Sequence, residues 1–395
     1  MLALHGGNKV VRKDFPVAKR FEGNELKYLQ EALEQNTLFY ASGKFVKRFI
    51  NTFADMIGMK HCVATSSCTA AVHTALAALG VGIGDEVISP PITDMGGLIG
   101  ILAQHAVPVF ADVDPGTYNI TAESIEAVIT PKTKAIIATH VAGNPCEMDE
   151  IMAVSRKYNI PVVEDCAQAY CTYYKGRPVG TFGDINCFSI NEYKHITAGD
   201  GGMIVTNDEE LARKALLFTD KGYNRTGKTL AETRAVNTFG MNYRMTELQG
   251  AVGLAQLEKL NYICSSLTTL GIELTKQLQD IPGIIPPKVY PHNISSNWFY
   301  MFKIDLDHFP CGPGKFAEAL EAEGVPASGG YIMRCIYKNE LFNDKYPDGL
   351  CPNAEQVLRE CIHLKFNFAY GIQDITAIAE AVGKIEKHRE TLNQL

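Results

Sequence analysis

Between residues 60 and 210 the sequence alternates short apolar, β-branched runs with longer stretches of helical periodicity. The apolar runs are nearly continuous, which is typical of parallel strands that are covered on both faces. We expect strands at 62–64, 86–89, 107–113, 134–140, 161–164, 185–189 and 203–206. We expect helices between them at 69–78, 95–104, 121–128, 148–158 and 209–218. This alternation predicts an α/β fold with a mostly parallel central sheet.

The segments on either side of this region have a different character. Two amphipathic helices are expected near 23–34 and 43–57, and one long helical stretch at 245–278. After Pro282, prolines interrupt short strands, and these alternate with expected helices at 315–323, 354–360 and 375–388. We therefore predict an N-terminal arm and large domain over residues 1–265. A smaller α+β domain is predicted over residues 266–395.

Composition and charge exclude several classes of protein. The chain has 395 residues, with 37 basic and 44 acidic side chains and a formal net charge of −7. This mild acidity gives no general attraction to nucleic acid or to anionic membranes. No apolar run reaches the ~18 residues of a membrane-spanning helix, and the N-terminal residues lack the apolar core of a signal peptide. We expect a cytoplasmic protein.

Eleven cysteines are scattered along the chain without a C-x-x-C pair or the spacing of a zinc site. Several lie within apolar runs, as Cys187 does. We expect free thiols in a reducing compartment, and no metal site.

Ligands of open α/β sheets bind at the carboxyl ends of the strands, so the residues just after each strand are candidates for chemistry. The first candidate is the turn at 65–71, where small hydroxyl residues lie between a strand and a helix N-terminus. Unpaired N–H groups and the helix dipole favour an anion at such a turn. An ordinary Ser or Thr N-cap explains the same residues.

Two further candidates carry ionisable side chains. Asp165 ends an apolar strand, where a carboxylate is costly unless it is paired with a cation; it could instead cap the next helix. Lys194 follows the strand that ends at Ser189 and precedes a glycine-rich turn. An apolar setting favours the neutral, nucleophilic amine, although a surface lysine would also fit this position.

The three candidates together meet the needs of pyridoxal 5′-phosphate (PLP). Its phosphate requires an anion site, its pyridine nitrogen a carboxylate, and its aldehyde a lysine amine.

At these residues the chain resembles the sugar aminotransferases of the DegT/DnrJ/EryC1/StrS family, which have PLP fold type I. The resemblance covers roughly residues 20–385 and is densest at 67–85, 163–208 and 239–257. Near the lysine, the matching residues are Lys194, Thr197, Gly199, Asp200, Gly201 and Gly202. The early Gly6-Gly7 and Val11-Arg12 pairs are similar to the cyclitol aminotransferases of this family. Thr197-Ala198-Gly199 and Cys351-Pro352-Asn353 are similar to the aminohydroxybenzoate synthases.

The resemblance implies a role for each matching residue. Lys194 would bind the cofactor aldehyde covalently and then shuttle a proton, and Asp165 would pair with the pyridine nitrogen. Gln168 would lie near the ring hydroxyl. The remaining implied cofactor-binding residues are Ser189, Cys68 and Thr69 for the phosphate and Asn242 for the phosphate of a partner's cofactor. The functional unit would then be a homodimer with shared active sites.

This sequence departs from the family pattern at three positions. Cys68 stands where a glycine is common, and Asp200 replaces the more usual glutamate. Asp94 stands where the family places an aromatic residue that stacks on the cofactor ring. Either Met95 or another side chain covers the ring, or Asp94 faces polar groups of the substrate.

The implied activity is transfer of an amino group from glutamate or glutamine to a keto-sugar or cyclitol ketone, with PLP cycling through pyridoxamine 5′-phosphate. An alternative is a PLP-dependent dehydratase or aromatising synthase of the same family. A PLP-binding sensor without turnover is a further alternative. A nucleotide-binding α/β protein is disfavoured, because the sequence contains neither G-x-G-x-x-G nor a P-loop motif.

Overall fold

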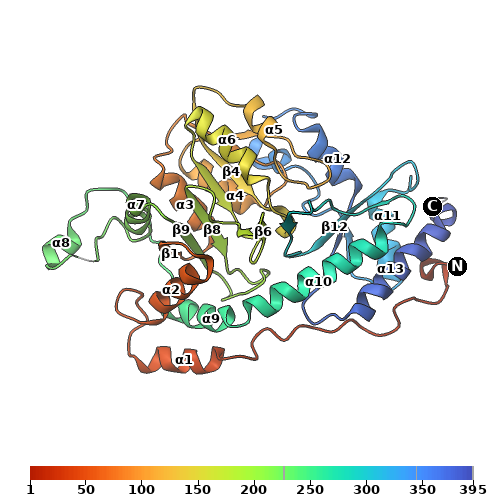
Figure 1. The fold of residues 1–395 in the computed structure, drawn as a ribbon, viewed down its shortest axis with the longest axis horizontal. Coiled ribbons are helices and arrows are strands. Elements are labelled where there is room, and N and C mark those ends of the chain that lie inside the picture. The colour runs from red at the N-terminus through yellow and green to blue at the C-terminus, as the bar shows by residue number, and fades with distance from the viewer. Residues whose placement is uncertain (226, 344, 394–395) are drawn as a thin grey trace.

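A computed structural model describes residues 1–225, 227–343 and 345–393. Its central sheet has the strand order β1-β9-β8-β5-β4-β2-β3. Figure 1 labels β1, β9, β8 and β4 of this sheet. The strands are β1 (His61–Thr65), β2 (Glu86–Ser89), β3 (Val107–Phe110), β4 (Thr133–Thr139), β5 (Val162–Asp165), β8 (Ile185–Ser189) and β9 (Gly202–Thr206). All neighbours are parallel except β9, which runs antiparallel to both β8 and β1. The structure confirms the predicted mostly parallel α/β sheet.

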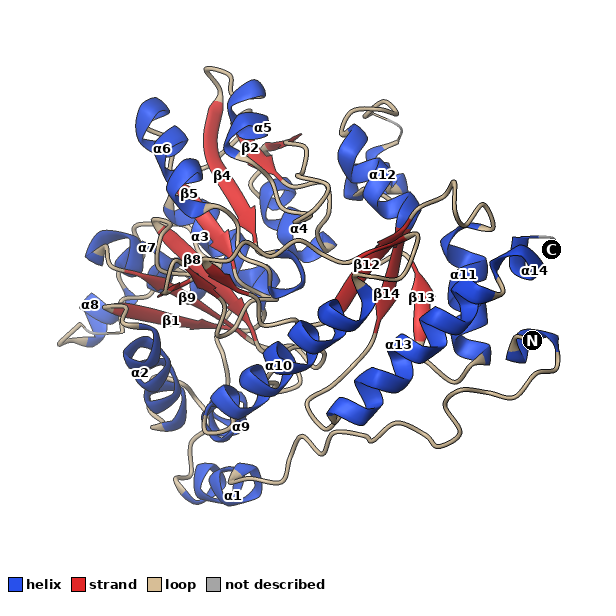
Figure 2. Cartoon of the chain, turned by 45° about the vertical axis from the view of Figure 1, so that its right-hand side comes forward, coloured by secondary structure: helices blue, strands red, loops and turns tan. Residues whose placement is uncertain are grey.

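Helices flank this sheet (Figure 2). They are α2 (Phe45–Ile57), α3 (Cys68–Ala78), α4 (Met95–Ala103), α5 (Ala122–Ala127), α6 (Met148–Tyr158), α7 (Glu209–Thr219) and α9 (Glu247–Leu257). Helix α3 packs against α4 and α7, while α2 packs against α9. Every residue of β5, β8 and β9 is buried, as expected for strands that are covered on both faces.

The prediction of one continuous helix over 245–278 is wrong. Helix α9 ends at Leu257, and a second helix, α10, spans Leu260–Leu278. The side chains at the break hold helix α1 (Glu25–Glu34): Glu258 accepts hydrogen bonds from Asn24 and Tyr28, and Lys259 forms an ion pair with Glu25. Apolar periodicity continues across the break, so the hydrophobic pattern does not reveal it.

The part of the chain after α10, here called the C-terminal region, contains an antiparallel sheet of order β10-β12-β14-β13. Its strands are β10 (Ile284–Ile285), β12 (Tyr300–Ile304), β13 (Ala327–Gly329) and β14 (Cys361–Leu364). Its helices are α11 (Gly312–Ala322), α12 (Pro352–Glu360), α13 (Ile372–Lys387) and α14 (Arg389–Asn393), with η3 (Ile336–Lys338) and η4 (Glu340–Phe342).

The predicted domain boundary at 265/266 falls inside α10 and stays a prediction; residues 344, 394 and 395 of the predicted smaller domain lie outside the described residues. A third, small sheet joins β6 (Tyr173–Tyr174) and β7 (Arg177–Pro178) to β11 (Asn293–Ile294) of the C-terminal region. The remaining elements are η1 (Ala3–His5), η2 (Val141–Gly143) and α8 (Leu230–Arg234).

Residues 1–22, here called the N-terminal strap, contain η1 but are otherwise extended or irregular. The strap starts beside the C-terminal region and runs along the molecule to α1 (Figure 1). In the described residues, no helix combines the length and the apolar character needed to cross a bilayer.

Candidate active site

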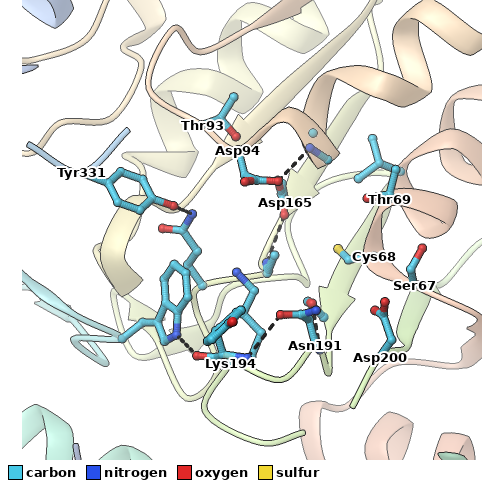
Figure 3. Close-up of a pocket in the computed structure, with 18 residues that line it drawn as sticks. Ser67, Cys68, Thr69, Thr93, Asp94, Asp165, Asn191, Lys194, Asp200 and Tyr331 are labelled. Carbon is cyan, nitrogen blue, oxygen red and sulfur yellow. Dashed lines mark hydrogen bonds between the residues drawn. The ribbon is translucent and has the colours of Figure 1, made fainter. Parts of the chain in front are cut away.

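A cavity of about 450 Å³ opens at the carboxyl edge of the central sheet (Figure 3). Six of the seven predicted site residues line it: Cys68, Thr69, Asp165, Gln168, Ser189 and Lys194. The other described lining residues are Ser67, Val72, Thr93, Asp94, Gly96, Gly97, Ala167, Asn191, Tyr193, Asp200, Trp298 and Tyr331. The strands β1, β5 and β8 all point toward this edge, and that shared direction brings together side chains that are far apart in sequence.

The turn before α3 supports both of its sequence interpretations. Ser67 is the N-cap of α3, and its hydroxyl accepts a hydrogen bond from the N–H of Ala70 at 3.1 Å. Cys68 and Thr69 are the first helical residues, whose N–H groups have no partner within the helix, and both line the cavity. The helix is therefore capped by one residue and still presents an anion-binding end with the next two.

Glycine at position 202 lets β9 approach this turn closely. A Cβ atom there would lie 2.6 Å from the carbonyl oxygen of Ser67 and 2.8 Å from the nitrogen of Cys68. Gly202 is also paired with Thr65 and Ser189 in the sheet. Any larger residue would push the turn before α3 away from the strands.

Asp165 ends β5 as a buried carboxyl, with 5% of its surface exposed. Its Oδ1 accepts a hydrogen bond from the N–H of Ala167 at 3.0 Å. Burial raises the pKa of Asp165 above its ordinary value, while the backbone N–H and the Lys194 ammonium act in the opposite direction. A cation bound in the cavity beside this carboxyl would offset the cost of burying it.

Lys194 projects into the same cavity from the turn after β8, facing the region around Asp165 (Figure 3). Burial lowers the pKa of the Lys194 amine, although Cys68, Asp165 and Asp94 partly oppose that shift by attraction. Its Nζ lies 3.7 Å from the ring centroid of Trp298. An amine with a lowered pKa in a cavity is suited to nucleophilic attack and to proton transfer.

Gln168 is held by two hydrogen bonds. Its Oε1 accepts from the N–H of Ala142 at 2.7 Å, and its Nε2 donates to the hydroxyl of Tyr331 at 3.0 Å. Ser189 is also buried, and its hydroxyl accepts from the N–H of Asn191 at 3.2 Å. Both side chains are therefore fixed in position at the cavity wall.

Asp94 caps helix α4, and its Oδ1 accepts from the N–H of Gly96 at 2.8 Å. The sequence left open whether Met95 or another side chain covers the cofactor ring or Asp94 faces the substrate. Asp94 lines the cavity, and Met95 is not among its described lining residues. The glycines that follow keep the space open, since a Cβ at Gly97 would lie 3.1 Å from Thr93 Oγ1 and 3.5 Å from Asp165 Oδ2.

Asn242 does not line the cavity of the single chain. It is exposed and forms a β-bridge with Asp220, on the segment that leads into α9. Asp220 is itself buried and forms ion pairs with Arg225 and Arg244. The expected contact of Asn242 with a partner's cofactor stays a prediction.

Sequence reasoning missed two aromatic side chains of the cavity, Trp298 and Tyr331. Trp298 lies in the loop between β11 and β12, and Tyr331 follows β13. Trp298 is the only tryptophan of the chain, and this was the one signal that could have drawn attention to it.

A second group of potential ligands lies outside the cavity. Single atoms of His140, Glu164 and Cys166 lie within 4.8 Å of one another, and all three residues are buried. The Glu164 carboxylate accepts from His140 Nε2 at 3.1 Å and from the backbone N–H groups of Gly180, Phe182 and Gly183. These bonds use the oxygens of the Glu164 carboxylate, which thereby holds the loop at 180–183 in place.

The donor set at the cavity fits PLP in its chemistry. The helix end at Cys68 and Thr69 suits a phosphate, the buried Asp165 suits a protonated ring nitrogen, and Lys194 suits an aldehyde. The lack of a side chain at Gly97 leaves room beside Asp165 for a flat ring.

Comparison with known proteins gives three kinds of match. The model of the DegT/DnrJ/EryC1/StrS aminotransferase family matches residues 19–383. The chain is 31% identical over 414 residues to a putative L-glutamine:3-amino-2,3-dideoxy-scyllo-inosose aminotransferase of Streptoalloteichus tenebrarius, covering 99% of each chain. It is 42% identical over 244 residues to GDP-perosamine synthase of Caulobacter vibrioides, covering 62% of this chain and 64% of that one. A solved structure of 3-amino-5-hydroxybenzoic acid synthase matches with a TM-score of 0.86 and 28% identity, over 95% of this chain and 99% of that one.

Proposed function

Because the chain belongs to the DegT/DnrJ/EryC1/StrS aminotransferase family, we propose that it aminates the ketone of a keto-sugar or cyclitol, with glutamate or glutamine as the donor. It is an aminotransferase, and its cofactor is pyridoxal 5′-phosphate. The observation that carries the proposal is the convergence of Lys194 and Asp165 on one cavity beside the N-terminus of α3.

When bound, PLP supplies an aldehyde that reacts with amines and a cationic ring that withdraws electrons from the attached carbon. In this proposal the phosphate of PLP is bound by the first turn of α3, at Cys68 and Thr69, together with Ser189. Asp165 would keep the ring nitrogen protonated, because a buried carboxylate gains most from a cation beside it. Gln168 would lie beside the ring hydroxyl.

In this proposal Lys194 has two tasks. It would bind the cofactor aldehyde through Nζ, and as a free amine it would accept and return a proton. Both tasks need the neutral amine, and burial lowers the pKa of Lys194 in that direction. The half-buried position of Lys194 in the cavity limits the access of bulk water to its amine.

Hydroxyl-rich substrates suit the polar lining of the cavity. The side chains of Asp94, Asn191 and Asp200 offer oxygen acceptors at its lining, and Tyr193 lies beside them. Polar groups of this kind bind sugar or cyclitol hydroxyls by hydrogen bonds. The relatives named for a nucleotide-linked sugar and for an inosose point to the same class.

A second copy of the chain would complete the site. We propose a homodimer in which Asn242 reaches the phosphate of the partner's cofactor, because Asn242 is exposed and turned out of its own cavity. We also propose that the protein acts in the cytoplasm. Its eleven cysteines are all free, which fits a reducing compartment.

The proposal is tested by loading the purified protein with PLP and adding glutamate or glutamine. We expect the cofactor spectrum to change to that of pyridoxamine phosphate, and a keto-sugar or inosose to reverse the change and leave as an amine. Borohydride reduction before the donor is added should mark Lys194 in the peptide map. Failure of both donors to convert the cofactor would overturn the assignment. A dehydrated or aromatised product would favour the dehydratase alternative.

A further inference from the structure

The backbone of the turn that carries Lys194 is bound by a side chain from the other end of the sequence. The guanidinium of Arg20 donates to the carbonyl oxygen of Glu192 through Nη1 at 2.5 Å. Its Nη2 donates to the carbonyl of Lys194 and, at 3.3 Å, to that of His195. One planar group therefore binds three carbonyls within four residues, a geometry for which the fork of an arginine is suited.

The remaining carbonyl of this turn is bound from another side. The indole N–H of Trp298 donates to the carbonyl oxygen of Tyr193 at 2.6 Å. Every carbonyl from residue 192 to residue 195 is thus a hydrogen-bond acceptor for a distant side chain. A loop that carries a reacting amine gains from such external bonds, because they fix the backbone from which the amine projects.

The environment of Arg20 indicates that these carbonyls are the main partners of its guanidinium. Its side chain is half-buried, and its Nε is buried without a hydrogen-bond partner among the described residues. Burial lowers the pKa of Arg20, with Glu192 acting weakly in the other direction. Arg20 forms no ion pair in the described part of the chain, so the carbonyls are what offset the cost of burying its charge.

The N-terminal strap that carries Arg20 is fixed to the C-terminal region. The buried carboxylate of Glu323 accepts from the backbone N–H of Ala3 at 2.8 Å and of Val10 at 3.0 Å, and it pairs with Lys384 at 2.8 Å. The N–H of Val11 also donates to the carbonyl of Glu323 at 3.0 Å. The backbone N–H groups of the first half of the strap are therefore hydrogen-bonded to Glu323 of the C-terminal region.

The second half of the strap is held before Arg20 and at the backbone of Arg20 itself. Phe15 stacks on Tyr370 with ring centroids 4.9 Å apart, and Asn367 donates to the carbonyl of Pro16 at 3.2 Å. The carbonyl of Arg20 itself accepts from Gln256 at 2.7 Å and from Lys259 at 2.6 Å. These contacts determine where the guanidinium lies.

We propose that Arg20 is a positioning residue: the N-terminal strap holds its guanidinium against the carbonyls of residues 192–195, and this contact fixes the turn from which the Lys194 amine projects. The inference rests on the proposed function for the importance of Lys194. The contact itself does not depend on that function, and it can be measured without cofactor.

The structural part is tested by hydrogen–deuterium exchange on the cofactor-free protein. In Arg20→Met, we expect the amides of residues 192–199 to exchange about tenfold faster, because the backbone bonds within that turn lose their external support. Lys19→Met is the matched control, since Lys19 is exposed and pairs with Glu22 at the surface. Unchanged exchange at 192–199 in Arg20→Met overturns the proposal. Faster exchange spread over the whole chain also overturns it.

The functional part is tested on the PLP-loaded protein. In Arg20→Met we expect kcat to fall by about tenfold to a hundredfold, with KM for the amino donor changing less than about threefold, because a misplaced reacting group is costly. The pH at which the absorbance of the lysine-bound cofactor changes should also shift. Arg20→Lys should recover only part of kcat, since an ammonium cannot bind three carbonyls in one plane. Wild-type kcat and pH profile in Arg20→Met contradict the proposal, whereas an active Lys194→Ala protein would contradict the proposed function alone.

Discussion

The amine of Lys194 lies 3.7 Å from the ring centroid of Trp298, and the indole N–H of that tryptophan binds the carbonyl of the residue just before the lysine. The first contact acts on the side-chain amine, and the second acts on the backbone that carries it. The face of the indole attracts the ammonium form of the amine, while burial favours the neutral form. Trp298 therefore orients the amine and affects its protonation at the same time.

Replacing Lys194 by alanine should abolish turnover. We expect kcat to fall by at least about 10³-fold, because no other amine lines the described cavity to take the proton. The absorbance of covalently held cofactor should also be lost, while the Tm of the cofactor-free protein changes little. Lys60→Ala, at an exposed surface position, should leave all three measurements unchanged. Normal transamination by Lys194→Ala would disprove the assignment.

Asp165→Asn should separate activity from stability. The amide keeps an oxygen for the N–H of Ala167 but cannot hold a positive charge on the ring, so we expect kcat to fall by about 10²-fold. Steady-state kinetics at saturating donor measure this loss. Retention of full kcat would show that Asp165 is not the partner of the ring nitrogen.

The same variant gives a prediction about pH. Because the pKa of Asp165 is raised in the folded protein, the folded state binds more protons than the unfolded state between pH ~4 and that raised pKa. The cofactor-free wild type should therefore lose stability as pH rises from about 4 through the raised pKa. Asp165→Asn should lack that loss. Urea unfolding of both proteins across this range measures the difference, and parallel curves would contradict the raised pKa.

Gly202→Ala should weaken cofactor binding. The added Cβ would lie 2.6 Å from the Ser67 carbonyl, so the turn before α3 must shift. We expect a loss of about 1–3 kcal/mol in stability and a raised Kd for PLP. Gly82→Ala is the control, since a Cβ there meets nothing within 4 Å. Equal Kd values for the two variants would exclude the turn as the phosphate site.

The emission of Trp298 should report cofactor binding directly. It is the only tryptophan of the chain and lines the cavity, so we expect its fluorescence to fall when PLP is added to the cofactor-free protein. Lys194→Ala should show the fall with weaker apparent affinity, because the covalent bond is missing. A titration that leaves the emission unchanged would place the cofactor away from Trp298.

The site residues that lie at or just after the ends of strands could be predicted from the sequence. Asp165 and Ser189 end apolar runs, and Lys194 follows closely, so the rule for parallel sheets brings them to one edge. Trp298, Tyr331 and Arg20 come from loops and the N-terminal strap, whose paths depend on long-range packing. The periodicity of apolar residues does not identify such positions. For the same reason it did not reveal the break between α9 and α10 at Glu258–Lys259.

The reversed direction of β9 has a consequence for how the loop 190–201 can vary. Since β8 and β9 form an antiparallel pair, a hairpin connection suffices, whereas a parallel pair would need a crossover helix between Ser189 and Gly202. Lys194 thus sits on the loop of a hairpin, without a helix to absorb insertions or deletions. Natural variants of this enzyme should change length elsewhere along the chain and keep this loop constant.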